Sequence, residues 1–147
     1  MKKKILVAGG AGFIGFHLCQ KLLKNNKVIC LDNYFTGSKN NVEILSKNKN
    51  FSFIKKNVQK KIFIECDEIY NLACPASPKK YQKNPLDTIK TNIFGTINLL
   101  EIAKKNNAKI FQASTSEVYG DPLIHPQGED YRGNVNIIGV RACYDEG

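Results

Sequence analysis

No stretch of this sequence is long and apolar enough to cross a membrane, since a transmembrane helix needs roughly 20 consecutive apolar residues. The N-terminal stretch MKKKILVAGGAGFIG resembles a signal peptide in its three lysines and the apolar run that follows them. Four glycines within seven residues make a poor signal helix, however, and no small-x-small cleavage site follows. We therefore expect a cytoplasmic protein without a membrane partner.

Paired cysteines and metal-ligand patterns are also missing. The five cysteines form no C-x-x-C pair, and the two histidines are not spaced as metal ligands would be. We expect reduced, structural thiols and no metal. Cys143 has no histidine nearby in the sequence to activate it as a nucleophile.

Arginine is scarce, and the net charge of +9 comes almost entirely from lysine. Such a charge can attract an anionic partner, such as nucleic acid or a phosphorylated ligand. The lysines, however, recur with asparagine in short segments between apolar runs, which indicates solvated surface. The densest cluster, residues 55–61, has no arginine and only the isolated Phe63 nearby, so a base-stacking surface is not supported. We expect no nucleic-acid partner.

Short β-branched runs alternate with helical patterns, which predicts an α/β fold: a doubly wound parallel sheet with helices on both faces. At 147 residues and 42% apolar composition, the chain suits one domain, residues 1–147. The segments between the third and fourth strands (58–65) and from 120 to 139 are expected to be irregular. The expected strands are 4–9, 27–32, 51–56, 67–73 and 109–114, and the expected helices are 13–24 and 85 to about 105.

The helix expected from residue 85 has the clearest local signals. Asn84 can cap it, Pro85 suits its first position, and Asp87 is favourable to the helix dipole in the first turn. Its apolar positions repeat every three or four residues: Leu86, Ile89, Ile93, Ile97 and Leu100. In the helix expected at 13–24, the apolar side chains expected to face the sheet are Phe13, Leu18, Leu22 and Leu23.

The stretch VAGGAGFIG contains a glycine pattern typical of dinucleotide binding. Gly9, Gly12 and Gly15 form G-x-x-G-x-x-G, and G-x-G-x-x-G is satisfied as well when it is counted from Gly10. The pattern follows an expected strand and opens an expected helix, and Asp32 lies 20 residues beyond Gly12, at the end of the next strand.

The physical reasons for this pattern are direct. A side chain at Gly12 would collide with an approaching pyrophosphate, which the helix N-terminus attracts. Asp32 can accept hydrogen bonds from both ribose hydroxyls and would repel a 2′-phosphate, so NAD is favoured over NADP. The alternative is that the glycines only form a tight turn. A P-loop is excluded because no G-K-[ST] closes the motif.

Three regions resemble one known family: GGAGFIG at 9–15, NLACPASP at 71–78, and STSEVYGDP at 114–122 with GVRACYDEG at 139–147. Together they are similar to the extended short-chain dehydrogenases/reductases, the NAD-dependent epimerase/dehydratase family, and within it to the UDP-glucuronate decarboxylases. The resemblance implies a Rossmann-type sheet and the conversion of UDP-glucuronate into UDP-xylose through a 4-keto intermediate, with NAD recycled in the site. It also implies further strands and a substrate-binding domain beyond residue 147, so we expect this chain to be an N-terminal part.

The catalytic residues that the resemblance implies lie in the last third of the chain. Tyr144 stands where the family has the tyrosine of its Y-x-x-x-K pair, and the lysine would be position 148. We therefore expect the chain alone to be inactive. Thr115 matches the residue that hydrogen-bonds the reacting oxygen, while Ser116 and Glu117 distinguish the decarboxylases from their relatives. Glu117 is either an acid/base group near C5 of the sugar or only a surface charge.

The resemblance also implies binding residues. Asn57 stands where relatives usually have aspartate against the adenine amino group, and its amide oxygen can still accept. The cofactor residues implied are Gly9, Gly12, Phe13, Ile14, Gly15, Asp32, Asn33, Phe35, Thr36, Asn57, Val58, Leu72, Cys74, Thr91 and Ala113. The candidates for the sugar or diphosphate are Lys90, Asn98, Lys104 and Lys105, although the last two also suit solvated helix positions.

Two other functions stay open: a nucleotide-sugar 4-epimerase or 4,6-dehydratase of the same family, and a non-catalytic NAD-binding module. Relatives commonly form homodimers through helices, one of which would be the 85–105 helix and the other the helix that starts near Tyr144. Because the second helix is cut short, we do not expect this chain to dimerise.

Overall fold

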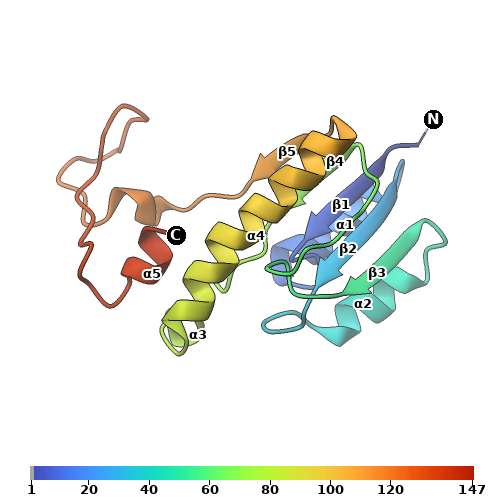
Figure 1. Ribbon diagram of the computed structural model, residues 1–147, viewed down its shortest axis with the longest axis horizontal. Coiled ribbons are helices and arrows are strands. Elements are labelled where there is room, and N and C mark those ends of the chain that lie inside the picture. The colour runs from blue at the N-terminus through green and yellow to red at the C-terminus, as the bar shows by residue number, and fades with distance from the viewer. Residues whose placement is uncertain (1) are drawn as a thin grey trace.

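The computed structural model describes residues 2–147 and is built around a five-stranded parallel sheet (Figure 1). The strand order is β3-β2-β1-β4-β5, so the direction of winding reverses between β1 and β4. This order confirms the expected doubly wound sheet, and it creates a switch point at the carboxyl ends of the central strands. The strands are β1 (Lys4–Ala8), β2 (Lys27–Asp32), β3 (Phe51–Lys55), β4 (Glu68–Asn71) and β5 (Lys109–Gln112).

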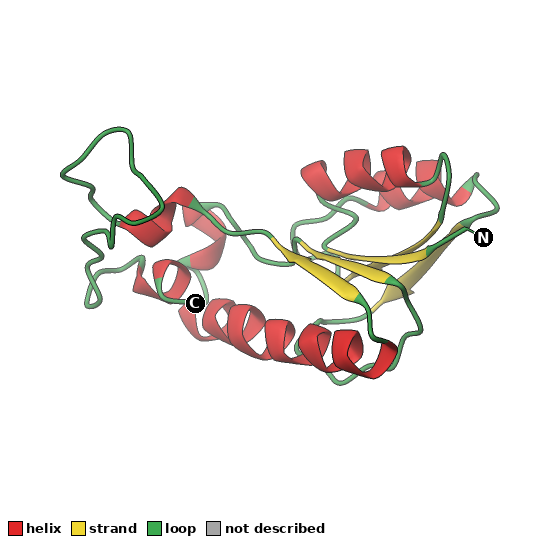
Figure 2. Cartoon of the chain, turned by 90° about the horizontal axis from the view of Figure 1, so that it is seen from above, coloured by secondary structure: helices red, strands yellow, loops and turns green. Residues whose placement is uncertain are grey.

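Helices cover both faces of the sheet, with α1 and α2 on one side and α4 on the other (Figure 2). The alternation of β1 explains the two layers, because Ile5 and Val7 pack under α1 and α2 while Leu6 and Ala8 pack under α4. The short helices α2, α3 and η1 were not predicted from the sequence. The helical elements are α1 (Phe13–Leu22), α2 (Lys39–Ser46), α3 (Pro78–Tyr81), α4 (Pro85–Asn106), the 3₁₀ helix η1 (Ser116–Tyr119) and α5 (Ala142–Asp145).

The prediction for the side of α1 that faces the sheet is confirmed for Leu18, Leu22 and Leu23, and fails only at Phe13. Gly15 and Cys19 are buried, and Leu18 and Leu22 pack partly against the same core. Phe13, in contrast, is 80% exposed, because the first turn of α1 stands beyond the carboxyl ends of the strands. The expectation that Phe13 faces the sheet is therefore wrong.

The apolar stripe of α4 points away from the sheet. Leu86, Ile93, Ile97 and Leu100 are exposed. The buried residues of α4 are Thr88, Gly95, Asn98, Leu99, Ile102 and Ala103. A Cβ atom at Gly95 would lie 2.7 Å from Cγ1 of Val58, so only glycine allows the helix to approach this closely. The periodic pattern thus predicted the helix correctly, but most of the apolar residues in the pattern lie on the exposed face of the helix.

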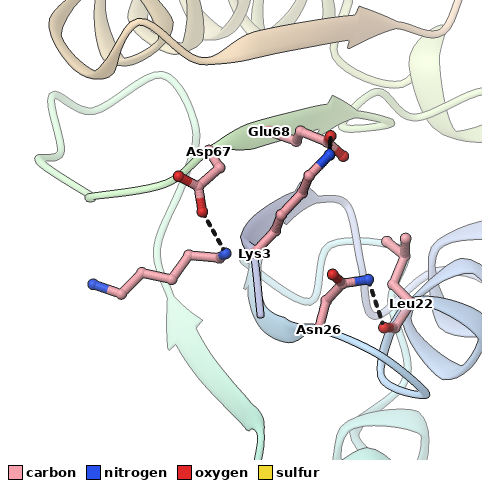
Figure 3. Close-up of polar contacts among 6 residues, drawn as sticks. Lys3, Leu22, Asn26, Asp67 and Glu68 are labelled. Carbon is pink, nitrogen blue, oxygen red and sulfur yellow. Dashed lines mark hydrogen bonds and ion pairs between the residues drawn. The ribbon is translucent and has the colours of Figure 1, made fainter. Parts of the chain in front are cut away.

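The amino ends of the strands are held by polar contacts (Figure 3). The Lys3 Nζ lies 2.5 Å from Glu68 Oε1, and the backbone N–H of Lys4 donates to Asp67 Oδ2 at 2.7 Å. The Asn26 side chain donates to the carbonyl of Leu22 at 3.1 Å after the end of α1. The glycine-rich turn lies at the opposite edge of the sheet, where the strands have their carboxyl ends.

After β5 the chain leaves the sheet, and its last segment folds beside the start of α4 (Figure 1). β5 is an edge strand, and its Phe111 is 54% exposed next to the ring of Tyr70. Within residues 2–147, none of the helices is both long and apolar enough to span a membrane.

Candidate functional site

The glycine-rich turn lies between β1 and α1 and needs glycine for two different reasons. Gly9 adopts a φ of +80°, and a Cβ atom there would lie 2.6 Å from the carbonyl oxygen of Leu72. A Cβ atom at Gly15 would overlap the carbonyl of Gly9. At Gly12 a Cβ would meet only the Gly9 oxygen at 3.3 Å, so its other sides are open. The space beside Gly12 is therefore open in the other directions, and we call this glycine-rich turn the cradle.

The first turn of α1 supplies this cradle with hydrogen-bond donors. Gly12 is the N-cap residue, and α1 has neither a side-chain cap nor an acidic residue in its first turn. The early amides of a helix have no partner within the helix and carry the positive end of its dipole. This turn, which includes Phe13, Ile14 and Gly15, therefore fits the diphosphate of a dinucleotide.

Asp32 ends β2 beside the cradle. Its Oδ2 accepts a hydrogen bond from the backbone N–H of Ala11 at 3.1 Å, and its Oδ1 accepts one from the backbone N–H of Tyr34 at 2.7 Å. Burial raises the pKa of this carboxyl above its ordinary value, and the backbone hydrogen bonds partly oppose the rise. Each oxygen keeps a second lone pair, so the carboxylate can still accept from ribose hydroxyls.

The loop after Asp32 continues the same edge of the sheet. The Asn33 side chain accepts from the backbone N–H of Phe35 at 2.9 Å, and Phe35 and Thr36 are exposed. Gly37 was missed from the sequence: a Cβ atom there would lie 2.9 Å from Asp32 Oδ1. A glycine shortly after the acidic residue was the available signal.

The turn after β3 is attached to α4. Asn57 Oδ1 accepts from the N–H of Gln59 at 2.9 Å, so one of its lone pairs is already used. Val58 is buried against Gly95, and its carbonyl accepts from Asn98 Nδ2 at 2.8 Å. Asn98 is only 8% exposed, and its side-chain amide is used in this contact within the core.

Residues after β4 and β5 reach the same edge. The Leu72 N–H donates to the backbone carbonyl of Ala8 at 2.9 Å, and the Ala113 N–H donates to the backbone carbonyl of Asn71 at 3.0 Å. Cys74 follows β4, and burial raises the pKa of its thiol to about 11. Such a thiol stays protonated at neutral pH, so Cys74 can line the site without acting as a nucleophile.

The candidate catalytic residues lie in the segment that follows β5. The Thr115 hydroxyl accepts from the N–H of Glu117 at 3.3 Å and caps η1, while Ser116 is exposed. Glu117 forms an ion pair with Arg141, which lies three residues before Tyr144. The pair therefore connects η1 to α5, the helix that carries Tyr144.

Tyr144 itself packs on a second tyrosine. Its ring is stacked on that of Tyr81, with centroids 4.7 Å apart and an interplanar angle of 7°. Tyr81 is buried at the end of α3, so it provides a fixed surface for the Tyr144 ring. Neither Tyr81 nor Arg141 was predicted, although Arg141 stands within the stretch GVRACYDEG.

The lysine candidates are not brought together. Lys90 is exposed in the first half of α4, whereas Lys104 and Lys105 lie in its last turn, at the amino edge of the sheet. The Lys105 Nζ lies 5.6 Å from the centroid of the Phe63 ring. Because α4 runs antiparallel to the strands, its two ends lie at opposite edges, and the last two lysines are remote from the cradle.

Together, the sheet and the cradle define an α/β protein of the short-chain dehydrogenase/reductase type. Residues 6–136 match the family model described as GDP-mannose 4,6 dehydratase, so the chain belongs to this family of nucleotide-sugar enzymes.

Within this family, the chain is similar to UDP-glucuronic acid decarboxylases. The chain is 59% identical over 146 residues to UDP-glucuronic acid decarboxylase 6 of Arabidopsis thaliana, covering 98% of this chain and 43% of that protein. It is 54% identical over 147 residues to UDP-glucuronic acid decarboxylase 1 of Danio rerio, covering 99% of this chain and 35% of the relative. The chain thus spans less than half of the length of these relatives.

Solved structures show the same fold. UDP-N-acetylglucosamine 4-epimerase from Methanobrevibacter ruminantium superposes with a TM-score of 0.83 at 30% identity, over 99% of this chain and 48% of that one. UDP-glucose 4-epimerase from Bifidobacterium longum, solved in complex with NAD+ and UDP, gives a TM-score of 0.78 at 28% identity, over 89% of this chain and 42% of that one.

Proposed function

We propose that this chain is the NAD-binding part of a UDP-glucuronate decarboxylase, which converts UDP-glucuronate into UDP-xylose. The observation that carries the proposal is the 54–59% identity to UDP-glucuronic acid decarboxylases over nearly the whole chain. The sequence STSEVYGDP, with Glu117 in place, supports the decarboxylase over its epimerase and dehydratase relatives.

NAD fits the cradle described above. The amides at the start of α1 would hold its diphosphate, the open side of Gly12 would admit it, and Asp32 would accept hydrogen bonds from its ribose. The chemistry that NAD supplies when bound is the removal of hydride from C4 of the sugar and its later return. The carboxylate of Asp32 disfavours a 2′-phosphate by charge repulsion, which supports NAD over NADP.

Three side chains of this chain would act on the sugar. Tyr144 would take the proton of the C4 hydroxyl, and Thr115 would hold the reacting oxygen by a hydrogen bond. Glu117, held by Arg141, would serve as acid or base near C5 after carbon dioxide has left. The β-keto acid formed by oxidation at C4 releases carbon dioxide readily, because the ketone accepts the electron pair of the broken C–C bond.

The polypeptide of residues 1–147 is proposed to be inactive by itself. A free tyrosine has a pKa of about 10 and needs a nearby cation to become a base at neutral pH. The family resemblance assigns this role to a lysine four residues after Tyr144. We also propose a cytoplasmic location, which cell fractionation with an antibody against the chain would test.

Two assays test the proposal. In the first, NAD binding to the purified chain is measured by isothermal titration calorimetry, and UDP-glucuronate turnover is followed by chromatography of the nucleotide sugars. We expect binding without turnover. In the second, the chain is joined to the C-terminal part of the Arabidopsis relative, and this chimera is expected to release carbon dioxide and form UDP-xylose. A 4-epimer or a 4-keto-6-deoxy sugar as the product would instead identify a sibling enzyme.

A further inference from the structure

Gln59 connects the turn after β3 to the first two turns of α4. Its side-chain Nε2 donates to Asp87 Oδ1 at 2.8 Å and to Thr91 Oγ1 at 2.9 Å, and it lies 3.3 Å from the Asp87 carbonyl. These residues are 28 and 32 positions apart from Gln59 in the sequence. The contact is therefore tertiary, and it is partly buried.

The orientation of the Gln59 amide is fixed by its partners. The Thr91 hydroxyl donates to the carbonyl of Asp87 at 2.7 Å, so its oxygen must accept from Gln59. An ionised Asp87 carboxylate can only accept as well. The nitrogen of Gln59, and not its oxygen, must therefore face α4.

The same residue holds the neighbouring turn through its backbone. The Gln59 N–H donates to Asn57 Oδ1 at 2.9 Å, and Val58 between them is fixed by Gly95 and Asn98. This turn adjoins the end of β2, because the Lys56 N–H donates to the Asp32 carbonyl at 3.1 Å. Gln59 thus connects the segment beside Asp32 with Thr91 on a different element.

We propose that Gln59 is a positioning residue for the cofactor: its amide holds Asn57 and Val58, beside Asp32, in a fixed relation to Thr91. The inference rests on the proposed function, since it assumes that NAD occupies this edge of the sheet. Gln59 acts through its neighbours, and its role depends on donating hydrogen bonds and not on filling space.

Two substitutions of similar size separate these roles. Gln59→Glu keeps the shape but removes the donor and places a second carboxylate against Asp87. Gln59→Lys supplies a cationic donor that can reach the same oxygens. A residue that only fills space would tolerate both changes about equally, whereas a residue that donates hydrogen bonds would tolerate only the lysine.

The test is NAD binding to the 147-residue chain, measured by isothermal titration calorimetry. We expect Gln59→Glu to raise the Kd about tenfold, because the hydrogen bonds to the Asp87 carboxylate and the Thr91 hydroxyl are lost and a repulsion is added. Gln59→Ala should raise the Kd about three- to tenfold. Gln59→Lys should bind within about twofold of the wild type. Gln20→Ala, at an exposed position of α1, is the matched control and should leave the Kd unchanged.

Hydrogen–deuterium exchange of the ligand-free protein provides the second readout. Gln59→Glu should speed exchange of the amides at 57–59, and Gln59→Lys should restore their protection. Equal effects of the two variants on Kd, or unchanged exchange in Gln59→Glu, would overturn the proposal. If the wild type binds no NAD, the proposed function fails, and the exchange data alone decide whether Gln59 holds the turn.

Discussion

At the scale of single residues, two glycines of the turn are required by the packing of the protein itself, whereas the third has open space beside it. Gly9 and Gly15 have backbone atoms where a side chain would stand, whereas Gly12 faces an opening. The sequence pattern treats all three alike, because spacing does not reveal which neighbour lies against each Cα. Only the packing of β4 and α1 around the turn separates them.

This division predicts opposite results for two alanine substitutions. Gly15→Ala should lower the free energy of unfolding by about 1–3 kcal/mol, because its methyl group overlaps the turn. Gly12→Ala should melt near the wild-type temperature yet lose NAD affinity. Thermal unfolding and calorimetric titration measure the two effects, and normal NAD binding by Gly12→Ala would exclude a diphosphate from this position.

The proposed contact between Asp32 and NAD should make NAD binding depend on pH. Burial raises its pKa in the folded protein, so the folded state holds this proton more tightly than the unfolded chain does. The stability contributed by the protonated form is therefore present at low pH and is lost as pH rises from the ordinary aspartate value, about 4, through the raised pKa. The same deprotonation creates the carboxylate that is proposed to accept hydrogen bonds from the ribose.

The expected outcome is that NAD affinity falls on acidification at a pH above the ordinary aspartate range. Titration of the Asp32 carboxyl carbon by NMR should give the same midpoint as the calorimetric Kd series. Asp32→Asn, which cannot ionise, should bind more weakly and lose this dependence. A midpoint at or below about 4 would show that burial does not govern this group.

At the scale of secondary-structure elements, α4 shows what periodicity can and cannot predict. The capping residues and the repeat of apolar positions placed its start correctly at Pro85. They could not show that Leu86, Ile93 and Leu100 face outward, because an apolar stripe does not reveal which surface it will meet. The buried face depends on Gly95, whose role follows from its contact with Val58.

Two substitutions on α4 test which side is the core. Gly95→Leu should lower the free energy of unfolding by about 1–3 kcal/mol, since the new side chain overlaps Val58. Ile93→Ser, on the exposed stripe, should change it by no more than about 0.5 kcal/mol. Urea denaturation followed by circular dichroism measures both, and a larger loss for Ile93→Ser would reverse the assignment of the two faces.

At the scale of the whole molecule, the fold and the candidate site were predictable to different degrees. The parallel sheet followed from alternating patterns, and Asp32 followed from its distance to the glycines. The stack of Tyr144 on Tyr81 and the pairing of Glu117 with Arg141 join segments that no local pattern connects. The placement of Lys104 and Lys105 depends on the length and direction of α4, which the resemblance alone did not supply.

The chimera offers a catalytic test of the same arrangement. Tyr144→Phe removes only the hydroxyl and keeps a ring to stack on Tyr81, so NAD binding and thermal stability should stay near those of the unsubstituted chimera. The rate of UDP-xylose formation should fall by about 10²–10⁴, the usual contribution of a general base. Retained activity would assign proton removal to another group.

The order of residues along the chain has a consequence for synthesis on the ribosome. Every residue proposed to bind the cofactor lies at or before Ala113, and the five described strands end by Gln112. N-terminal units fold first as a polypeptide emerges. We therefore expect the proposed cofactor site to be complete while the residues proposed to act on the sugar are still in the exit tunnel.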